Sequence, residues 1–426
     1  MIIKEAKKYI TSGNLDEKLS ALYGEEKLLS SRARYLGAIS EFERLYGDDR
    51  DISVYSVPGR SELSGNHTDH NGGKVIAASV DLDIVAVASA CAGSVVRLSS
   101  EGYSEDCVDF DVYSSPNADN YEKSSAIIAG VLSGMHAGGF RVGGFDAYTT
   151  STVPGGSGLS SSAAFENTVG TIINHLYNGG TIDGVTIAKI SQYAENAFFG
   201  KPCGLMDQIA CSVGGAVAID FADSKAPRVE QLPTDALDGY SLCIVNTGAS
   251  HADLTADYAA VPAEMKSVAA HFGKKTLREL TRDEVFSAAG ELRGKVGDRA
   301  IMRALHFFDE NKRVEAQTEA LRRKDTDAFF RGVLSSGRSS FCYLQNVYTA
   351  KNSAEQGVSL ALCVAESLLK SKKAAWRVHG GGFAGTIQAF VPEAYTESFA
   401  ASMDAVLGAG ACHSLKIRKN GAERII

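Results

Sequence analysis

The run PGGSGLSSSAA, residues 154–164, decides the fold. The residues before it, 145–153, are rich in Thr and aromatic side chains, as a strand would be, and apolar residues at helical spacing follow it as far as Leu176. A glycine-rich turn between a strand and a helix binds anions, because glycines let the backbone approach a phosphate and the helix start presents N–H groups and a positive dipole end. We therefore predict a phosphate loop made of Gly156, Ser157, Gly158, Leu159, Ser160, Ser161 and Ser162.

The glycine-rich segments allow two other interpretations. The loop at 154–164 could be a flexible turn capped by serine, and it is not a Walker A loop because no Lys follows its glycines. A second run, Gly380–Gly385, has the spacing GxGxxG, but strand-like residues follow it where a dinucleotide-binding motif would begin a helix. The strand before 154–164 and the helix after it favour a phosphate site there.

The length and composition favour a two-domain α/β (α+β) protein. A chain of 426 residues exceeds what one hydrophobic core usually serves, and we place the domains at residues 1–225 and 226–426. With 43 Lys+Arg against 51 Asp+Glu and no basic run, nucleic acid is not an expected partner. The eight cysteines show no CxxC pair, and the longest apolar stretch, 75–96, is broken by Asp81 and Asp83. We expect reduced thiols, no membrane partner and a cytoplasmic location; no particular oligomeric state is indicated.

Three further motifs accompany the phosphate loop in the order in which one family carries them. They are Pro58-Gly59-Arg60 with GNHTDHNGG at 65–73, AENAFFGKPCGLMDQ at 194–208, and GGGFAG at 380–385. With the loop, they resemble the motifs of the GHMP small-molecule kinases, and most closely those of the galactokinase branch. The resemblance implies a two-domain kinase fold with the active site between the domains, ATP and Mg²⁺ as cofactors, and transfer of the γ-phosphate to the anomeric hydroxyl of a galactose-type sugar.

The resemblance also implies roles for individual residues. Asp207 matches the catalytic aspartate that accepts the proton of the anomeric hydroxyl, and Arg60 matches the arginine that keeps this aspartate ionised and stabilises the transferring phosphoryl group. Ser162 and Glu195 match the Mg²⁺ ligands, for which a hydroxyl and a carboxylate are suitable hard donors. Taken singly, each charged residue could be a surface charge or a helix cap. The predicted sugar-binding residues are Asn66, His67, Asp69, Gly204 and Tyr258.

The first of these motifs, residues 58–73, is called the sugar motif below, and it departs from the galactokinase pattern at three positions. Galactokinases usually carry Asn at the position of Glu62, Glu at that of Asn66 and Tyr at that of His70, so the first two look exchanged. In the family this Glu contacts the sugar near C6, and an amide there would repel a C6 carboxylate less, although Glu62 could restore the charge nearby. Galactose is the hypothesis, with galacturonate or another galactose derivative as the alternative. A sensor that binds galactose and ATP without turnover is the alternative of another class.

Overall fold

The computed structural model describes residues 1–112, 115–155, 158–248 and 254–426. Contacts within the chain divide it into two compact units. Unit 1 comprises residues 1–60, 79–215 and 418–426, and unit 2 comprises residues 61–78 and 216–417. The chain passes between the units within strands β1 (Ser53–Ser64) and β2 (Lys74–Ala90), so neither unit is one continuous segment. The division into domains at 1–225 and 226–426 stays a prediction.

Unit 1 is built on a sheet whose strands follow the order β12-β1-β2-β5-β3-β4. Strand β5 (Phe145–Ser151) lies antiparallel to β2 and parallel to β3 (Val95–Ser100), which pairs with β4 (Asp106–Asp109); β12 (Glu423–Arg424) lies at the other edge. The run of apolar residues at 75–90 forms the long strand β2. It reads as continuously apolar because helices cover both faces of the sheet.

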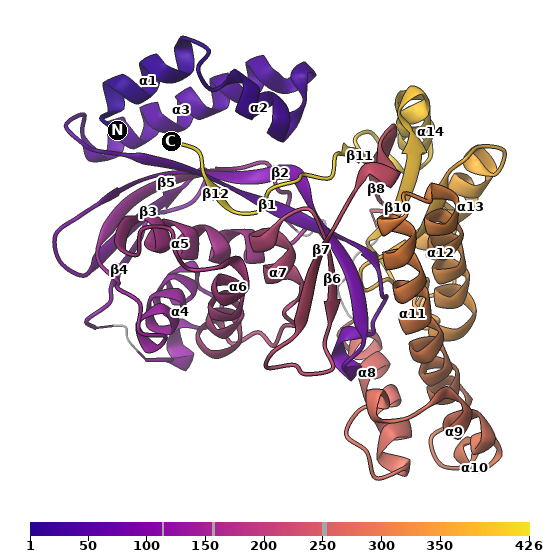
Figure 1. The fold of residues 1–426 in the computed structure, drawn as a ribbon. Helices are drawn as coiled ribbons and strands as arrows, with labels where there is room; N and C mark the ends of the chain where they lie inside the picture. Colours follow the sequence, from indigo (N-terminus) through magenta and orange to yellow (C-terminus); the bar gives the residue numbers. More distant parts are fainter. Residues whose placement is uncertain (113–114, 156–157, 249–253) are drawn as a thin grey trace. The chain divides into compact units, whose positions relative to one another are not determined.

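The helices of unit 1 form a layer on each side of this sheet (Figure 1). Val85 and Val87 of β2 join a core with the N-terminal helices, whereas Ala86 and Ala88 join a core with the helices of the other layer, as the alternation of strand side chains requires. The N-terminal layer consists of α1 (Ile3–Thr11), α2 (Asp16–Tyr23) and α3 (Leu28–Tyr46). The other consists of α4 (Ser124–Ala137), α5 (Ser161–Tyr177), α6 (Gly184–Tyr193) and α7 (Met206–Val213).

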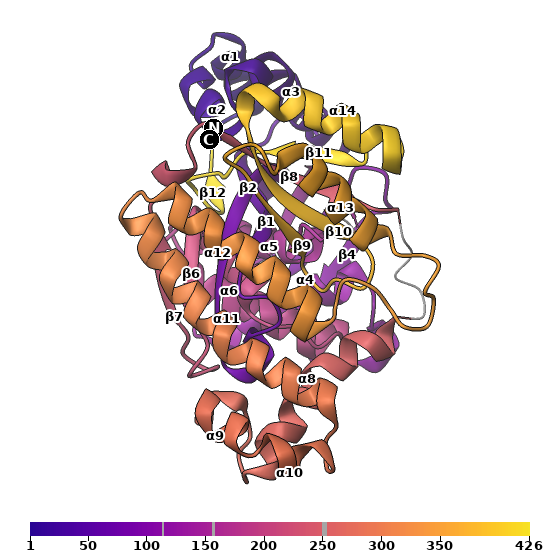
Figure 2. The same cartoon turned by 90° about the vertical axis from the view of Figure 1, so that its right-hand side faces the viewer.

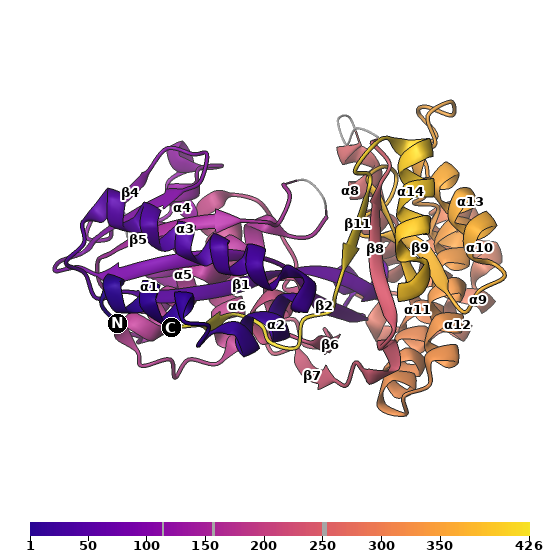
Figure 3. The ribbon, with the colours of Figure 1, turned by 90° about the horizontal axis from the view of Figure 1, so that it is seen from above.

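Unit 2 contains an antiparallel sheet with the strand order β11-β8-β10-β9. Its strands are β8 (Tyr240–Asn246), β9 (Ala375–His379), β10 (Thr386–Pro392) and β11 (Cys412–Leu415). Helices α13 (Gly357–Leu369) and α14 (Thr396–Leu407) pack on one face of this sheet in a shared core (Figure 3). Strands β6 (Ala216–Asp220) and β7 (Arg228–Leu232) pair beside residues 74–78 of β2.

The remaining helices of unit 2 include two long ones, α11 (Asp298–Arg322) and α12 (Thr326–Ser339), which lie side by side (Figure 2). Helix α11 also packs on α8 (Thr255–His271), α9 (Arg282–Ser287) and α10 (Ala289–Arg293). Among the described residues, no helix is both long and apolar enough to cross a membrane. Short helical turns are η1 (Glu25–Lys27), η2 (Asp69–Asn71), η3 (Ala118–Asn120), η4 (Ala194–Phe199), η5 (Asp235–Leu237), η6 (Leu277–Glu279), η7 (Ser340–Leu344) and η8 (Glu393–Tyr395).

Candidate active site

The loop at 154–164 joins strand β5 to helix α5, as the sequence predicts. Gly156 and Ser157 lie outside the described residues. Ser160 occupies the position before the helix with φ of 59°, in the left-handed region, and its carbonyl accepts a hydrogen bond from Ala164 N at 3.0 Å. The first N–H groups of a helix have no partner within the helix, so the start of α5 at Ser161 can receive a phosphate. The roles of Gly158 to Ser162 in binding nucleotide stay predictions.

Strand β1 approaches this loop closely at Gly59 and Arg60. The Arg60 amide donates to the carbonyl of Leu159 at 3.0 Å. A Cβ on Gly59 would lie 2.7 Å from the same oxygen, which is closer than side-chain carbons come to backbone atoms. Glycine is therefore required at position 59, because a side chain there would collide with the Leu159 carbonyl.

Arg60 and Asp207 form a bidentate ion pair within unit 1. The Arg60 Nε donates to Asp207 Oδ1 at 2.7 Å, and Nη2 donates to Oδ2 at 2.6 Å. The third Arg60 nitrogen, Nη1, donates to the carbonyl of Gly158 at 2.5 Å, and the Ser160 hydroxyl donates to Asp207 Oδ2. The two residues predicted to be catalytic are thus joined to each other and to the loop, although 147 positions separate them in the chain.

The surroundings of Asp207 keep its carboxyl ionised. Burial opposes ionisation, but the charge and hydrogen bonds of Arg60 outweigh it, so the pKa of Asp207 lies below its usual range. Asp207 also lies in the first turn of α7, where the helix dipole favours a negative charge. The side chain keeps 32% of its surface exposed, so it can still be reached by another molecule.

Glu195 lies on η4, a π-helical turn, close to Ser162. Its Oε1 accepts from the Ser162 hydroxyl at 3.4 Å and from Lys201 Nζ at 3.0 Å, and its Oε2 accepts from Gln208 Nε2 at 3.0 Å. Burial alone would lower the pKa of Lys201, but the Glu195 carboxylate outweighs burial and raises it. The two predicted metal ligands therefore lie together, and a cation already contacts the carboxylate.

Two residues beside Glu195 were missed in the sequence. Gln208 Nε2 also donates to Glu166 Oε2 at 3.1 Å, so this amide bridges the two carboxyl groups. Burial, and then the negative charge of Glu195, raises the pKa of Glu166 well above its usual range. Glu166 follows Ser162 by four residues on α5, and this spacing, which places both on one helix face, was the available signal.

In unit 2, the sugar motif begins with a turn that is held through its backbone. The amides of Gly65 and Asn66 both donate to Glu310 Oε1 at 3.3 Å, and His306 Nε2 contacts the Asn66 carbonyl at 3.0 Å. His67 follows with φ of 59°, an uncommon conformation for a side chain with Cβ, and its Nε2 contacts the Gly381 carbonyl at 2.9 Å. Glu310 and His306 were also missed, because no motif connects α11 with residues 65–67.

The buried His306, which contacts this turn, makes the free energy of unfolding depend on pH. Burial lowers the pKa of His306 from 6.5 to about 4, although Glu310 opposes the shift. Between these values the unfolded chain binds a proton that the folded protein does not, so stability is lost as pH falls from 6.5 towards 4. At pH 5 this loss amounts to about 2 kcal/mol for a shift of that size.

We expect His306→Gln to flatten the pH dependence of unfolding in this range. Urea unfolding at pH 7 and pH 5 would measure it, and the variant should lose less stability between the two than the wild type. His136→Gln, at an exposed position on α4, is the matched control and should keep the wild-type difference. An equal loss in wild type and His306→Gln would contradict the assignment.

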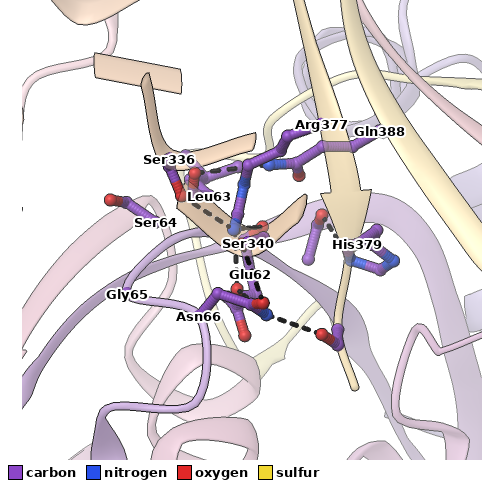
Figure 4. A network of polar contacts seen from close by, with 12 residues as sticks. Glu62, Leu63, Ser64, Gly65, Asn66, Ser336, Ser340, Arg377, His379 and Gln388 are labelled. Carbon is purple, nitrogen blue, oxygen red and sulfur yellow. Dashed lines mark hydrogen bonds and ion pairs between the residues drawn. The ribbon is translucent and has the colours of Figure 1, made fainter. Parts of the chain in front are cut away.

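Asn66 and Glu62 belong to one buried polar network with Arg377 of β9 (Figure 4). Arg377 Nη2 donates to Glu62 Oε1 at 2.6 Å, and the Asn66 amide nitrogen donates to the same oxygen at 3.3 Å and to the Gly380 carbonyl at 2.6 Å. Glu62 therefore does not add an unpaired negative charge next to Asn66, because Arg377 neutralises it. The network ties the sugar motif to the glycine-rich run at 380–385.

The other predicted sugar-binding residues lie in different surroundings. Tyr258 of α8 donates from its hydroxyl to the Gly382 carbonyl at 2.8 Å, and burial raises its pKa to about 12. Asp69 lies half-buried on η2, with His70 Nε2 3.8 Å from its Oδ1. Gly204 belongs to unit 1, where it precedes α7. Asn66, His67 and Tyr258 are thus gathered around the 380–382 backbone, and their contacts with a sugar stay predictions.

Known families match two regions that hold the predicted site residues other than Tyr258. The GHMP kinases N terminal domain matches residues 124–215, and the galactokinase galactose-binding signature matches residues 40–90. A galactokinase from Streptomyces coelicolor is 31% identical over 381 residues, which are 88% of this chain and 94% of that protein. The chain belongs to the galactokinase family. A galactokinase of Actinobacillus pleuropneumoniae serotype 5b is also 32% identical, over 84% of this chain and 90% of that protein.

Solved structures show that the galactokinase-family sequence has the expected fold. Lactococcus lactis galactokinase complexed with galactose superposes with a TM-score of 0.75 at 24% identity, over 90% of this chain and 98% of that chain. Methanococcus jannaschii mevalonate kinase superposes with a TM-score of 0.60 at 14% identity, over 86% of this chain and 98% of that chain. The resemblance drawn from four motifs and the predicted GHMP kinase fold are both confirmed.

Proposed function

We propose that the protein is a galactokinase, which transfers the γ-phosphate of ATP to the anomeric hydroxyl of galactose. The observation that carries this proposal is the bidentate contact of Arg60 with Asp207 beside the start of α5. This arrangement offers an ionised carboxylate to take a proton and a fixed positive charge to stabilise a phosphoryl group. A sensor without turnover would not need this pair, so we favour an enzyme.

The reaction follows from what each group can do. As the sugar oxygen forms its bond to the γ-phosphorus, its proton passes to the Asp207 carboxylate, and the bond to the β-phosphate oxygen breaks to release ADP. Arg60 and the start of α5 stabilise the negative charge on the transferring group, so that catalysis is largely positioning and electrostatics. Arg60, Asp207 and the start of α5 are thus the groups for the nucleotide and for catalysis, and Asn66, His67, Asp69, Gly204 and Tyr258 are the residues predicted for the sugar.

Ser162 and Glu195 would hold Mg²⁺ within this scheme. Their hydroxyl and carboxylate oxygens are the donors that this ion prefers, and the Lys201 ammonium on Glu195 Oε1 indicates that a cation is favourable at this position. When bound, the ion would neutralise charge on the β- and γ-phosphates of ATP. The residues present therefore fit the metal that the family resemblance implies.

Lys201 should compete with Mg²⁺ for Glu195. We expect Lys201→Met to tighten Mg²⁺ binding by about two- to fivefold. In the wild type the ion has to displace a partly exposed ion pair, and such a pair contributes a free energy of that size. Titration of Mn²⁺ followed by electron paramagnetic resonance would measure this without turnover. Lys189→Met on α6 is the control and should leave the affinity unchanged; weaker binding in Lys201→Met would show that Lys201 supports the metal instead.

Turnover with ATP and Mg²⁺ tests the proposed function directly. Galactose, galacturonate, N-acetylgalactosamine and fucose should be compared at equal concentration, and we expect galactose to have the highest kcat/KM. Turnover of galacturonate alone would overturn the galactose assignment. Binding of galactose and ATP without any product would instead favour the sensor.

Galacturonate is a second candidate because of one observation in unit 2. Both carboxylates that contact Asn66 are paired with arginines, Glu62 with Arg377 at 2.6 Å and Glu310 with Arg313 at 2.7 Å. Since Asn66 itself is neutral, this part of the sugar motif carries balanced charge. A sugar carboxylate would meet less repulsion here than beside an unpaired acidic side chain.

A further inference from the structure

The side chain of Asn66 has used its hydrogen-bonding capacity within unit 2. Its amide nitrogen donates to the Gly380 carbonyl at 2.6 Å and to Glu62 Oε1 at 3.3 Å. Its amide oxygen accepts from Asn346 Nδ2 at 2.8 Å and from the Ser340 hydroxyl at 3.2 Å. An amide group offers two donors and two acceptor positions, so these four contacts satisfy it. The residue is also completely buried.

In place of the direct sugar contact expected from the sequence, we propose that Asn66 is a positioning residue whose amide is held by Glu62. The inference rests on the proposed function in that His67 and Asp69 bind the sugar. Asn66 connects this segment to Gly380, while the next residue, His67, contacts Gly381 at 2.9 Å. The amide thus fixes the segment from which His67 and Asp69 project.

The chemistry of the site makes position 66 depend on position 62. The nitrogen of Asn66 lies between two acceptors, a carbonyl and a carboxylate, and only a donor fits there (Figure 4). A carboxylate at position 66 would face both acceptors without a proton to share, and in a buried site this repulsion is poorly screened. The identity of residue 66 is therefore coupled to the charge of residue 62.

Glu62 in turn is held by contacts from two strands of unit 2. Arg377 of β9 donates to its carboxylate at 2.6 Å and to its carbonyl at 3.3 Å. Gln388, opposite Arg377 on β10, accepts from Arg377 Nε at 2.7 Å and donates to the Glu62 carbonyl at 2.8 Å in the amide orientation that satisfies both partners. Arg377 thus orients Glu62, Glu62 orients the Asn66 amide, and Asn66 fixes residues 66–69.

Isosteric variants test this dependence. Asn66→Asp should raise the KM for galactose by about tenfold to a hundredfold, because the sugar-binding segment is displaced, and should leave the KM for ATP within about twofold. Glu62→Gln should have a smaller effect. When both substitutions are combined, the carboxylate introduced at position 66 no longer faces a second negative charge at position 62, and only the Gly380 carbonyl still opposes it. The KM of this double variant for galactose should therefore be closer to wild type than that of Asn66→Asp. An additive double variant, or equal effects on the two KM values, would overturn the proposal.

A series of monodeoxygalactoses separates positioning from direct contact. For a positioning residue, Asn66→Ser should raise KM by the same factor for galactose and for each deoxy sugar that keeps the anomeric hydroxyl. If Asn66 instead contacted one sugar hydroxyl directly, Asn66→Ser would not raise the KM for the deoxy sugar that lacks this hydroxyl. That result would overturn the inference. If the wild type does not phosphorylate galactose, this contradicts the proposed function and not the positioning role of Asn66.

The positioning role has a second readout that does not need a substrate. Hydrogen–deuterium exchange of the intact wild-type chain and of Asn66→Asp should be compared for peptides that cover residues 65–70 and 379–385. Faster exchange in both segments of the variant, with unchanged exchange in α5 of unit 1, is expected. Unchanged exchange in both segments would overturn the inference whatever the enzyme's substrate proves to be.

Discussion

Asp207→Asn is expected to abolish phosphoryl transfer while ATP binding is retained. The amide cannot accept the proton of the sugar hydroxyl and leaves the Arg60 guanidinium without its carboxylate partner. Loss of a general base alone reduces kcat by about 100- to 10,000-fold. ATP binding should persist, because the start of α5 and the backbone of the phosphate loop are unchanged. Initial rates with galactose and titration of a fluorescent ATP analogue would measure the two effects.

Asp183→Asn is a matched control for this variant. Asp183 also stands at a helix start in unit 1, where its carboxylate accepts from the Thr186 amide at 3.0 Å and caps α6. Its replacement should leave kcat within about twofold, since a cap changes helix stability and not the reacting groups. Wild-type turnover in Asp207→Asn would remove this residue from the catalytic role, and loss of ATP binding would point to misfolding of unit 1.

The parts of the site that the sequence predicted are those whose chemistry is local. The strand, glycine-rich turn and helix around residues 154–164 follow each other in the chain, so composition and periodicity revealed them. The pairing of Arg60 with Asp207 is not local, and only the order of family motifs indicated it.

The residues that were missed support the site from distant segments. Arg377 reaches Glu62 across 315 positions, and Glu310 reaches the backbone of Gly65 across 245. A buried arginine or glutamate has no periodicity of its own, so the sequence could only suggest surface charges. The idea that Glu62 restores a negative charge beside Asn66 also depended on its partner, and the partner neutralises that charge.

Arg377→Leu is expected to cause the largest loss of stability among the variants considered. Arg377 is completely buried, and its removal leaves the Glu62 carboxylate, itself buried, without a counter-charge. Breaking a buried ion pair in this way costs about 3–5 kcal/mol. For a unit of roughly 200 residues this corresponds to a fall in Tm of about 6–20 °C, which calorimetry would detect.

The double variant decides whether this loss comes from the uncompensated charge. Glu62→Gln removes the carboxylate that Arg377→Leu strands, so the combination should be more stable than Arg377→Leu alone, because replacing both partners of a buried pair costs far less than removing one. Arg338→Leu, at an exposed position on α12, should leave the Tm unchanged. If Glu62→Gln instead adds its own destabilisation to that of Arg377→Leu, the arginine acts through packing against its other neighbours, and Asn66 then owes its orientation to the strand backbone more than to the charge of Glu62.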